Sequence, residues 1–243
     1  LSGVVTYGQR EFAPPTGAAR IRVDGFTRAG LVLSSQPINV VAVADLTPAG
    51  LSAGARLLEN GQRLGQVKAR ITKLPGRGDF ATRLMRGTLE ADLAYDGPAE
   101  SLWRLAGIET FDITGPLGVN ASARGTLTNP RLTGSIASDN LRVQSAVSGT
   151  DITGATARGR FAGSRLEITR FSGTTAGNGS IVGSGTIDLA NMSAERGPRI
   201  DLRAAATNAR LINAAGLDAR LTGPLRIVSD GVGGTIAGRV RID

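Results

Sequence analysis

Apolar and polar residues alternate with a period of two along most of this chain. Between Leu117 and Leu127 the odd positions are aliphatic or small, whereas polar residues such as Ser122 and Arg124 occupy the even positions. The same alternation returns over residues 155–161, 181–189, 200–206, 217–227 and 236–242. Successive side chains of a β-strand point to opposite faces of the sheet, so this period predicts strands with one apolar and one solvated face. We therefore expect an all-β chain.

Turn-forming residues separate the alternating segments. Asn60-Gly61, between Leu57 and Leu64, is the strongest short hairpin signal. Further turns are predicted at Asn129-Pro130, Asp139-Asn140, Ser148-Gly149, Gly163-Ser164, Gly177-Asn178-Gly179 and Asp230-Gly231. Their spacing indicates an antiparallel meander of long strands.

Two segments depart from the alternation and predict short helices. They are residues 98–106, ended by Gly107, and residues 208–215, ended by Gly216. Each precedes a Thr-Gly-Pro-Leu motif, with a strand expected to start at its proline, and the two motifs lie 108 positions apart (223 − 115). We expect one continuous β segment of a longer protein, residues 1–243, with modules at about 1–112, 113–220 and a truncated 221–243.

The composition excludes most routes to catalysis. The chain has no Cys and no His, so it has no thiolate nucleophile, no imidazole base and no soft metal ligand. The 28 basic and 20 acidic residues give a net charge of +8, but no basic tract of the kind that binds nucleic acid. No apolar stretch is long enough for a membrane helix, so a membrane anchor would lie outside these residues. The chain is predicted to be non-enzymatic, without cofactor or metal.

Three local features have simple structural explanations. The glycine-rich run 173–185 lacks the Gly-Lys-Ser/Thr ending of a phosphate loop, so it predicts turns and close strand packing. Glu90 and Asp92 share the polar face of a strand over 88–95 and do not predict a catalytic pair. Trp103 is expected to pack its helix on the sheet.

The apolar face must be covered by something, because large exposed apolar patches are rare in monomers. A second sheet would make a closed sandwich, whereas acyl chains could fill an open groove. Aromatic residues are only 4% of the chain, which favours a groove, since closed cores commonly use aromatic side chains to fill space.

The amino-acid sequences of several segments resemble the repeats of the TamB family, the inner-membrane-anchored component of the translocation and assembly module. These segments are residues 96–107, 113–136 and 221–236. The resemblance covers most of the chain and extends to AsmA-like relatives. It implies a long, curved, mostly antiparallel sheet that forms an open, taco-like hydrophobic groove in the periplasm of a Gram-negative bacterium. It also implies phospholipid transport to the outer membrane, or assembly of outer-membrane proteins with a TamA-like POTRA-barrel partner.

We expect the apolar sides of the strands to form one lipid-sized groove with Arg124, Arg158, Asp188, Arg203, Arg220 and Arg239 on the opposite face. The residues predicted to line it are Leu117, Val119, Leu127, Ile136, Phe161, Ile168, Ile181, Leu189, Leu202, Leu221, Ile227 and Val240. Two rival architectures remain. A β-helical surface passenger repeats about every 20–30 residues, and an outer-membrane barrel needs aromatic girdles; the 108-residue spacing and the few aromatics disfavour them.

Overall fold

The computed structural model describes residues 2–8, 15–26, 37–106, 112–145, 148–190, 196–214 and 217–243. In these ranges the strands are β1 (Ser2–Gly8), β2 (Thr16–Phe26), β3 (Ile38–Thr47), β4 (Gly50–Glu59), β5 (Gln62–Thr72), β6 (Thr88–Pro98), β7 (Asp112–Thr114), β8 (Pro116–Thr126), β9 (Asn129–Gln144), β10 (Asp151–Gly163), β11 (Arg165–Thr175), β12 (Gly179–Asp188), β13 (Arg199–Ala214), β14 (Leu217–Ser229), β15 (Gly234–Gly238) and β16 (Arg241–Ile242). The helices are α1 (Phe80–Arg86) and α2 (Ala99–Ala106).

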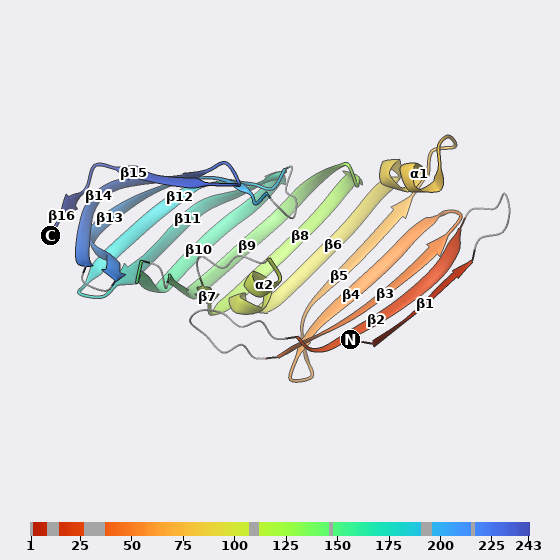
Figure 1. The fold of residues 1–243 in the computed structure, drawn as a ribbon, viewed down its shortest axis with the longest axis horizontal. Coiled ribbons are helices and arrows are strands. Elements are labelled where there is room, and N and C mark those ends of the chain that lie inside the picture. Colours follow the sequence, from red (N-terminus) through yellow and green to blue (C-terminus); the bar gives the residue numbers. More distant parts are fainter. Residues whose placement is uncertain are drawn as a thin grey trace. The chain divides into compact units, whose positions relative to one another are not determined.

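The strands form one open antiparallel sheet, and each strand generally pairs with the next in the chain (Figure 1). The exceptions are β7, which pairs with β9 so that β6 lies beside β8, and β16, which pairs with β14 next to β15. The predicted all-β, antiparallel open sheet is confirmed, and it contains two short helices, of which one lies at a predicted position. One antiparallel sheet is neither a two-sheet sandwich nor a parallel β-helix, so these two alternatives are wrong.

The sheet divides into two compact units. Unit 1 contains β1 to β5, α1, β6 as far as Asp96, and residues 119–133; unit 2 contains residues 97–118 and 134–243. In unit 1 the buried side chains Leu57, Ile71, Leu89 and Tyr95 lie on one face of β4 to β6. In unit 2 the core gathers around Ala99, Leu141, Ile152, Ala155 and Ile181.

Most predicted turns form where expected. Asn60 and Gly61 both have positive φ, 50° and 80°, and close the β4–β5 hairpin as a two-residue turn of this type requires. The turn predicted at Asn129-Pro130 lies just before these residues, at Leu127 and Thr128, because β9 begins at Asn129. The turn predicted at Asp139-Asn140 is wrong, because both residues lie inside β9.

The two segments predicted as helices have different structures. The first forms α2, but residues 208–214 belong to β13, so the second helix is wrong. The cause is pairing with β14, in which Arg210 faces Arg220 and Ile212 faces Ala219; tertiary hydrogen bonds override a weak helix propensity. The helix that the sequence did not predict is α1, which begins after Asp79, whose side chain accepts a hydrogen bond from the Thr82 N–H at 2.9 Å.

The two prolines of the repeated motif also differ. Pro116 is the first residue of β8, as predicted, whereas Pro224 lies inside β14, so a strand start there is wrong. Pro224 faces Ala205 on one side, and on the other side it falls between the pairings of Leu225 with Gly238 and Thr222 with Arg241. The missing N–H of proline is tolerated at this gap between β15 and β16. The module boundaries near residues 112 and 220 stay a prediction.

The sheet of unit 2 curls so that strands distant in the pairing order meet. The turn before β10 reaches β13, where the Asn213 N–H donates to the Ser148 carbonyl at 2.7 Å. The Thr150 hydroxyl donates to the Leu211 carbonyl at 2.5 Å. Because β11 and β12 separate β10 from β13 in the sheet, these bonds hold a bend across four strands.

The curl of unit 2 predicts that alanine substitution has different effects at two glycines with similar φ angles. Gly149 and Gly154 have φ of 67° and 57°, so alanine costs roughly 1 kcal/mol at either position. A Cβ at Gly149 would lie 1.8 Å from the Asn213 carbonyl oxygen, whereas one at Gly154 would meet no atom within 4 Å. We expect Gly149→Ala to lower the free energy of unfolding by roughly 1–3 kcal/mol more than Gly154→Ala in urea titrations. Equal losses would show that the contact with β13 is absent in solution.

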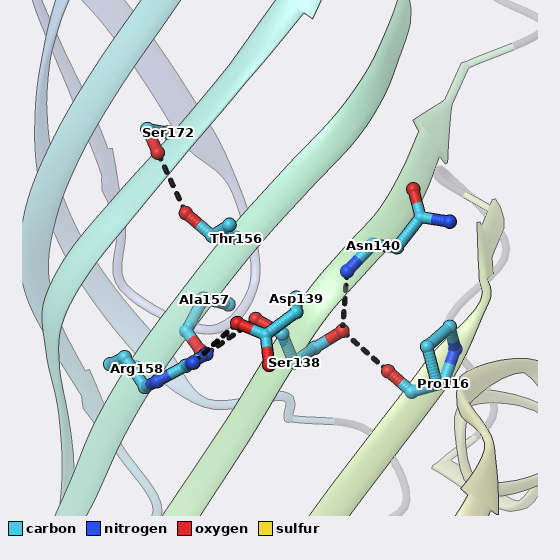
Figure 2. Close-up of polar contacts among 8 residues, drawn as sticks. All are labelled: Pro116, Ser138, Asp139, Asn140, Thr156, Ala157, Arg158 and Ser172. Atoms are coloured by element: carbon cyan, nitrogen blue, oxygen red, sulfur yellow. Dashed lines mark hydrogen bonds and ion pairs between the residues drawn. The ribbon is translucent and has the colours of Figure 1, made fainter.

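Helix α2 contains a buried hydroxyl group without a partner. The side chain of Ser101 has 0% exposure, and its Oγ makes no hydrogen bond. Ser138 is similarly buried, but its Oγ donates to the Pro116 carbonyl and accepts from the Asn140 N–H (Figure 2). We expect Ser101→Ala to leave the free energy of unfolding unchanged or raise it by about 1 kcal/mol, and Ser138→Ala to lower it by about 1–2 kcal/mol. Thermal and urea unfolding of both variants measures the difference, and a loss from Ser101→Ala equal to that from Ser138→Ala contradicts it.

Candidate functional site

The apolar face of unit 1 carries a line of alanines that crosses five strands. Strand pairing places these residues directly opposite one another from β2 to β6; they are Ala19, Ala44, Ala53, Ala69 and Ala91. Each of them is half-buried. Because alanine side chains are short, the line forms a low track in the surface of the sheet.

Larger aliphatic side chains border this track on both sides. One row contains Leu46, Leu51, Ile71 and Leu89. The other contains Ile21, Val67 and Leu93, with Ala42 and Ala55 between Ile21 and Val67, so the low surface is wider on β3 and β4. A shallow depression of about 190 Å³ lies here, lined by alanine, valine, isoleucine and glycine alone. Ile21 and Val67 remain 40% and 39% exposed, so protein side chains leave this surface open to a ligand. We call it the alanine furrow.

The opposite face of unit 1 is polar. Ser52, Arg70 and Glu90 face one another across β4, β5 and β6. Asp92 accepts hydrogen bonds from the Ser122 hydroxyl at 2.6 Å and from Arg124 at 3.1 Å. The pKa of Asp92 lies below its ordinary value, chiefly because of the Ser122 hydrogen bond and then because of Arg124. The acids at 90 and 92 are thus exposed on the solvated side, as expected.

The apolar face of unit 2 is partly filled and partly open. The core cluster and α2 cover the part near Ile152 and Ile181. Towards the other end of the strands, one row contains Phe161, Leu166, Ile187 and Ile200, and the next contains Ile168, Leu202, Ile227 and Ile236. Except for Ile236, which is 69% exposed, these residues are half-buried. They form the open part of this face.

The predicted groove residues divide into three groups. Val119, Ile181 and Leu221 are buried. Leu117, Ile136, Phe161, Ile168, Leu189, Leu202, Ile227 and Val240 are half-buried. Leu127 is 45% exposed in the turn after β8, and Leu189 also follows the end of its strand. The pairing brings Ile168, Leu202 and Ile227 into one row, whereas Leu127 and Leu189 lie at strand ends.

Sequence reasoning missed the alanine furrow. In β3 the run Val40-Val-Ala-Val-Ala44 is apolar at every position, so alternation is hidden there. The signal that could have found the furrow is the spacing of two between Ala42 and Ala44 and between Ala53 and Ala55. The side chain of Trp103 lies outside the described residues.

In the residues that the structure describes, no three acidic side chains gather in a way that could hold a metal ion. Within the same ranges, none of the helices has the length and apolarity needed to cross a membrane.

Ion pairs organise the polar face of unit 2 as well. Asp188, at the end of β12, accepts hydrogen bonds from the Ala190 N–H at 3.0 Å and the Ser164 hydroxyl at 3.2 Å, and it lies 3.3 Å from Arg199 and 3.7 Å from Arg165. The pKa of Asp188 is lowered, chiefly by the Ala190 N–H and then by Ser164 and the two arginines. Its carboxylate therefore stabilises the fold when it is ionised.

Asp188 gives a pH dependence that can be measured. A carboxyl group with a depressed pKa in the folded state stabilises the protein above its unfolded pKa of about 3.9, and this stabilisation is lost as the pH falls through the folded pKa. We expect Asp188→Asn to unfold at lower urea concentration than the wild type at pH 7, with a difference that shrinks below about pH 4. Asp45→Asn, which removes an exposed carboxylate without an ion pair in the described residues, is the control. A pH-independent difference for Asp188→Asn would contradict the assignment.

Comparison with known proteins gives one match. Residues 169–243 match the family model of the TamB C-terminal domain, which supports the resemblance noted from the sequence. The matched region begins in β11 and contains β12 to β16. No curated protein and no solved structure matches the chain.

Proposed function

We propose that this chain is a non-enzymatic part of a periplasmic β-groove scaffold that shields the acyl chains of phospholipids between the inner and outer membranes. The observation that carries the proposal is the uncovered apolar face, above all the alanine furrow of unit 1. An acyl chain is a flexible cylinder of methylene groups, and it is stabilised by aliphatic contact along its length. A low track between rows of leucine, isoleucine and valine offers such contact and demands no specific polar group.

The match to the TamB C-terminal domain supports a role in the cell envelope, in lipid transport or in assembly. In this proposal the protein is anchored in the inner membrane through parts outside this segment and acts with a TamA-like POTRA-barrel partner in the outer membrane. Support for outer-membrane protein assembly is the second form of the same proposal. An open sheet edge can pair with an incoming strand, and β1, the first strand of the sheet, is exposed along its whole length.

Photo-cross-linking from neighbouring residues of one strand tests the lipid proposal. Consecutive residues of a strand face opposite sides, so Ala53 points to the furrow and Ser52 to the polar face, and Ile187 and Thr186 form a second such pair in unit 2. A benzophenone amino acid at Ala53 or Ile187 should form adducts with radiolabelled phospholipid in cells, and one at Ser52 or Thr186 should form several-fold fewer. Equal labelling from both faces, or none from either, would reject the acyl-chain proposal.

A charge in the furrow tests whether lipid needs this surface. An unpaired carboxylate among acyl chains is strongly unfavourable, so Ala53→Glu should remove most of the lipid adducts formed from a benzophenone at Ile21, which lines the same depression. Ser52→Glu carries the same charge on the polar face and should leave the adducts unchanged. Urea unfolding of both variants shows whether each still folds, and a folded Ala53→Glu protein with normal lipid labelling contradicts the prediction.

A further inference from the structure

Strand β11 contains a bulge that places two consecutive side chains on the polar face of unit 2. Its pairing with β10 passes from Arg158 opposite Arg170 to Gly159 opposite Ile168, which leaves Thr169 as an extra residue. The pairing with β12 shifts at the same place, between Ile168 and Phe171. Thr169 and Arg170 are both exposed and both line one depression of about 410 Å³. Bulges commonly redirect side chains beside functional sites.

The bulge lies in a row of arginines that crosses the polar face. Arg158 faces Arg170, and Arg203 faces Arg226 two strands further on. Like charges that face each other directly on a sheet are destabilising unless something neutralises them.

Carboxylates neutralise the two outer arginines of this row. Arg158 is bound to Asp139 and donates to the Ser138 carbonyl at 2.6 Å (Figure 2). Arg226 donates to Asp201 through two nitrogens at 2.9 and 2.8 Å. The pKa of Asp201 is lowered chiefly by the Arg226 hydrogen bond, with the charges of Arg226 and Arg203 adding to it. These acids are thus already engaged by arginine.

Among the described residues, the side chains of the two inner arginines have no ion-pair or hydrogen-bond partner. In the described part of the chain, neither Arg170 nor Arg203 makes an ion pair or a side-chain hydrogen bond, although both line the depression. Ser184 lies between them on β12, directly opposite Arg203, and its hydroxyl is also without a hydrogen bond there. Of the described residues that line the depression, none is acidic. Its charged groups are therefore two cations with unused donors.

We propose that Arg170, Ser184 and Arg203 form a binding site for a phosphate group. Strands β11 and β13 flank β12, so the two arginine backbones are about 10 Å apart and their long side chains can meet above Ser184. Two guanidinium forks and a hydroxyl supply donors from three strands, which suits the several acceptor oxygens of a phosphate better than a planar carboxylate. An anion there would offset the repulsion along the arginine row.

The site lies on the face opposite the proposed acyl-chain surface. Leu202 precedes Arg203 in β13, and Ile168 precedes the bulge in β11; both belong to the apolar face. A lipid that lies on the apolar face therefore cannot place its phosphate between Arg170 and Arg203. The phosphate group comes either from a free phosphate compound or from headgroups at a membrane surface, and the phosphate chemistry is the same. The site does not depend on the proposed function.

The first arm of the test uses inorganic phosphate with the purified chain. Isothermal titration and the ¹⁵N shifts of the arginine Nε–H groups, measured at constant ionic strength against chloride, should show binding. Arg170→Gln and Arg203→Gln should each weaken it at least about tenfold, because each removes charge-assisted hydrogen bonds. Arg170→Lys, which keeps the charge but loses the fork, should weaken it less than Arg170→Gln does. Arg239→Gln removes another exposed, unpaired arginine charge and should change the affinity less than about twofold.

The second arm identifies the source of the phosphate. Co-sedimentation with phosphatidylcholine vesicles, with and without phosphatidic acid, should be reduced by Arg170→Gln and Arg203→Gln if headgroups occupy the site. Phosphate binding without vesicle binding assigns it to a free phosphate compound. An equal loss with Arg239→Gln, or no binding in either arm, overturns the proposal. Lipid cross-linking from Ala53 should be unaffected by these variants, so failure here is separable from failure of the proposed function.

Discussion

The register of hydrogen bonds between neighbouring strands is the constraint on which the rest of this structure depends. Because side chains alternate at every residue, a slip of one position would transfer a whole strand from one face to the other. Unbroken registers from β2 to β6 along the alanine line keep Ala44, Ala53 and Ala69 together and Ser52 and Arg70 on the other face. The furrow exists only through this alignment, since no single strand contains it.

Departures from this regular pairing create the specific features of unit 2. At Gly149 the turn before β10 comes so close to Asn213 that no side chain fits, and the bend of the sheet depends on that approach. At Thr169 the bulge places two consecutive residues on one face, where Arg170 lines the same depression as Ser184 and Arg203. A uniform sheet would have neither the partly filled core nor the cationic depression.

The two faces of the sheet contribute to the structure through different interactions. The apolar rows stabilise by burial, which is non-directional and tolerates a ligand of variable length. The polar rows contain ion pairs such as Arg226 with Asp201. Because these pairs are exposed, they position side chains more than they stabilise the fold. Arg170 and Arg203 have no carboxylate partner among the described residues and line the same depression, so they can bind an external anion together.

The sequence by itself determined the fold class, the face to which most residues point, and most turns. Alternation over residues 155–161 and 200–206 and the Asn60-Gly61 turn are local properties, because side-chain period and positive φ are decided within a few residues. Tertiary structure decided at which positions these local patterns do not hold. Residues 208–214 have the composition of a helix but complete the pairing with β14, and the Asp139-Asn140 segment continues β9 instead of turning. Which alanines meet across five strands, and which two unpaired arginines share one depression, follows from long-range register, and a single sequence does not contain that information in any local pattern.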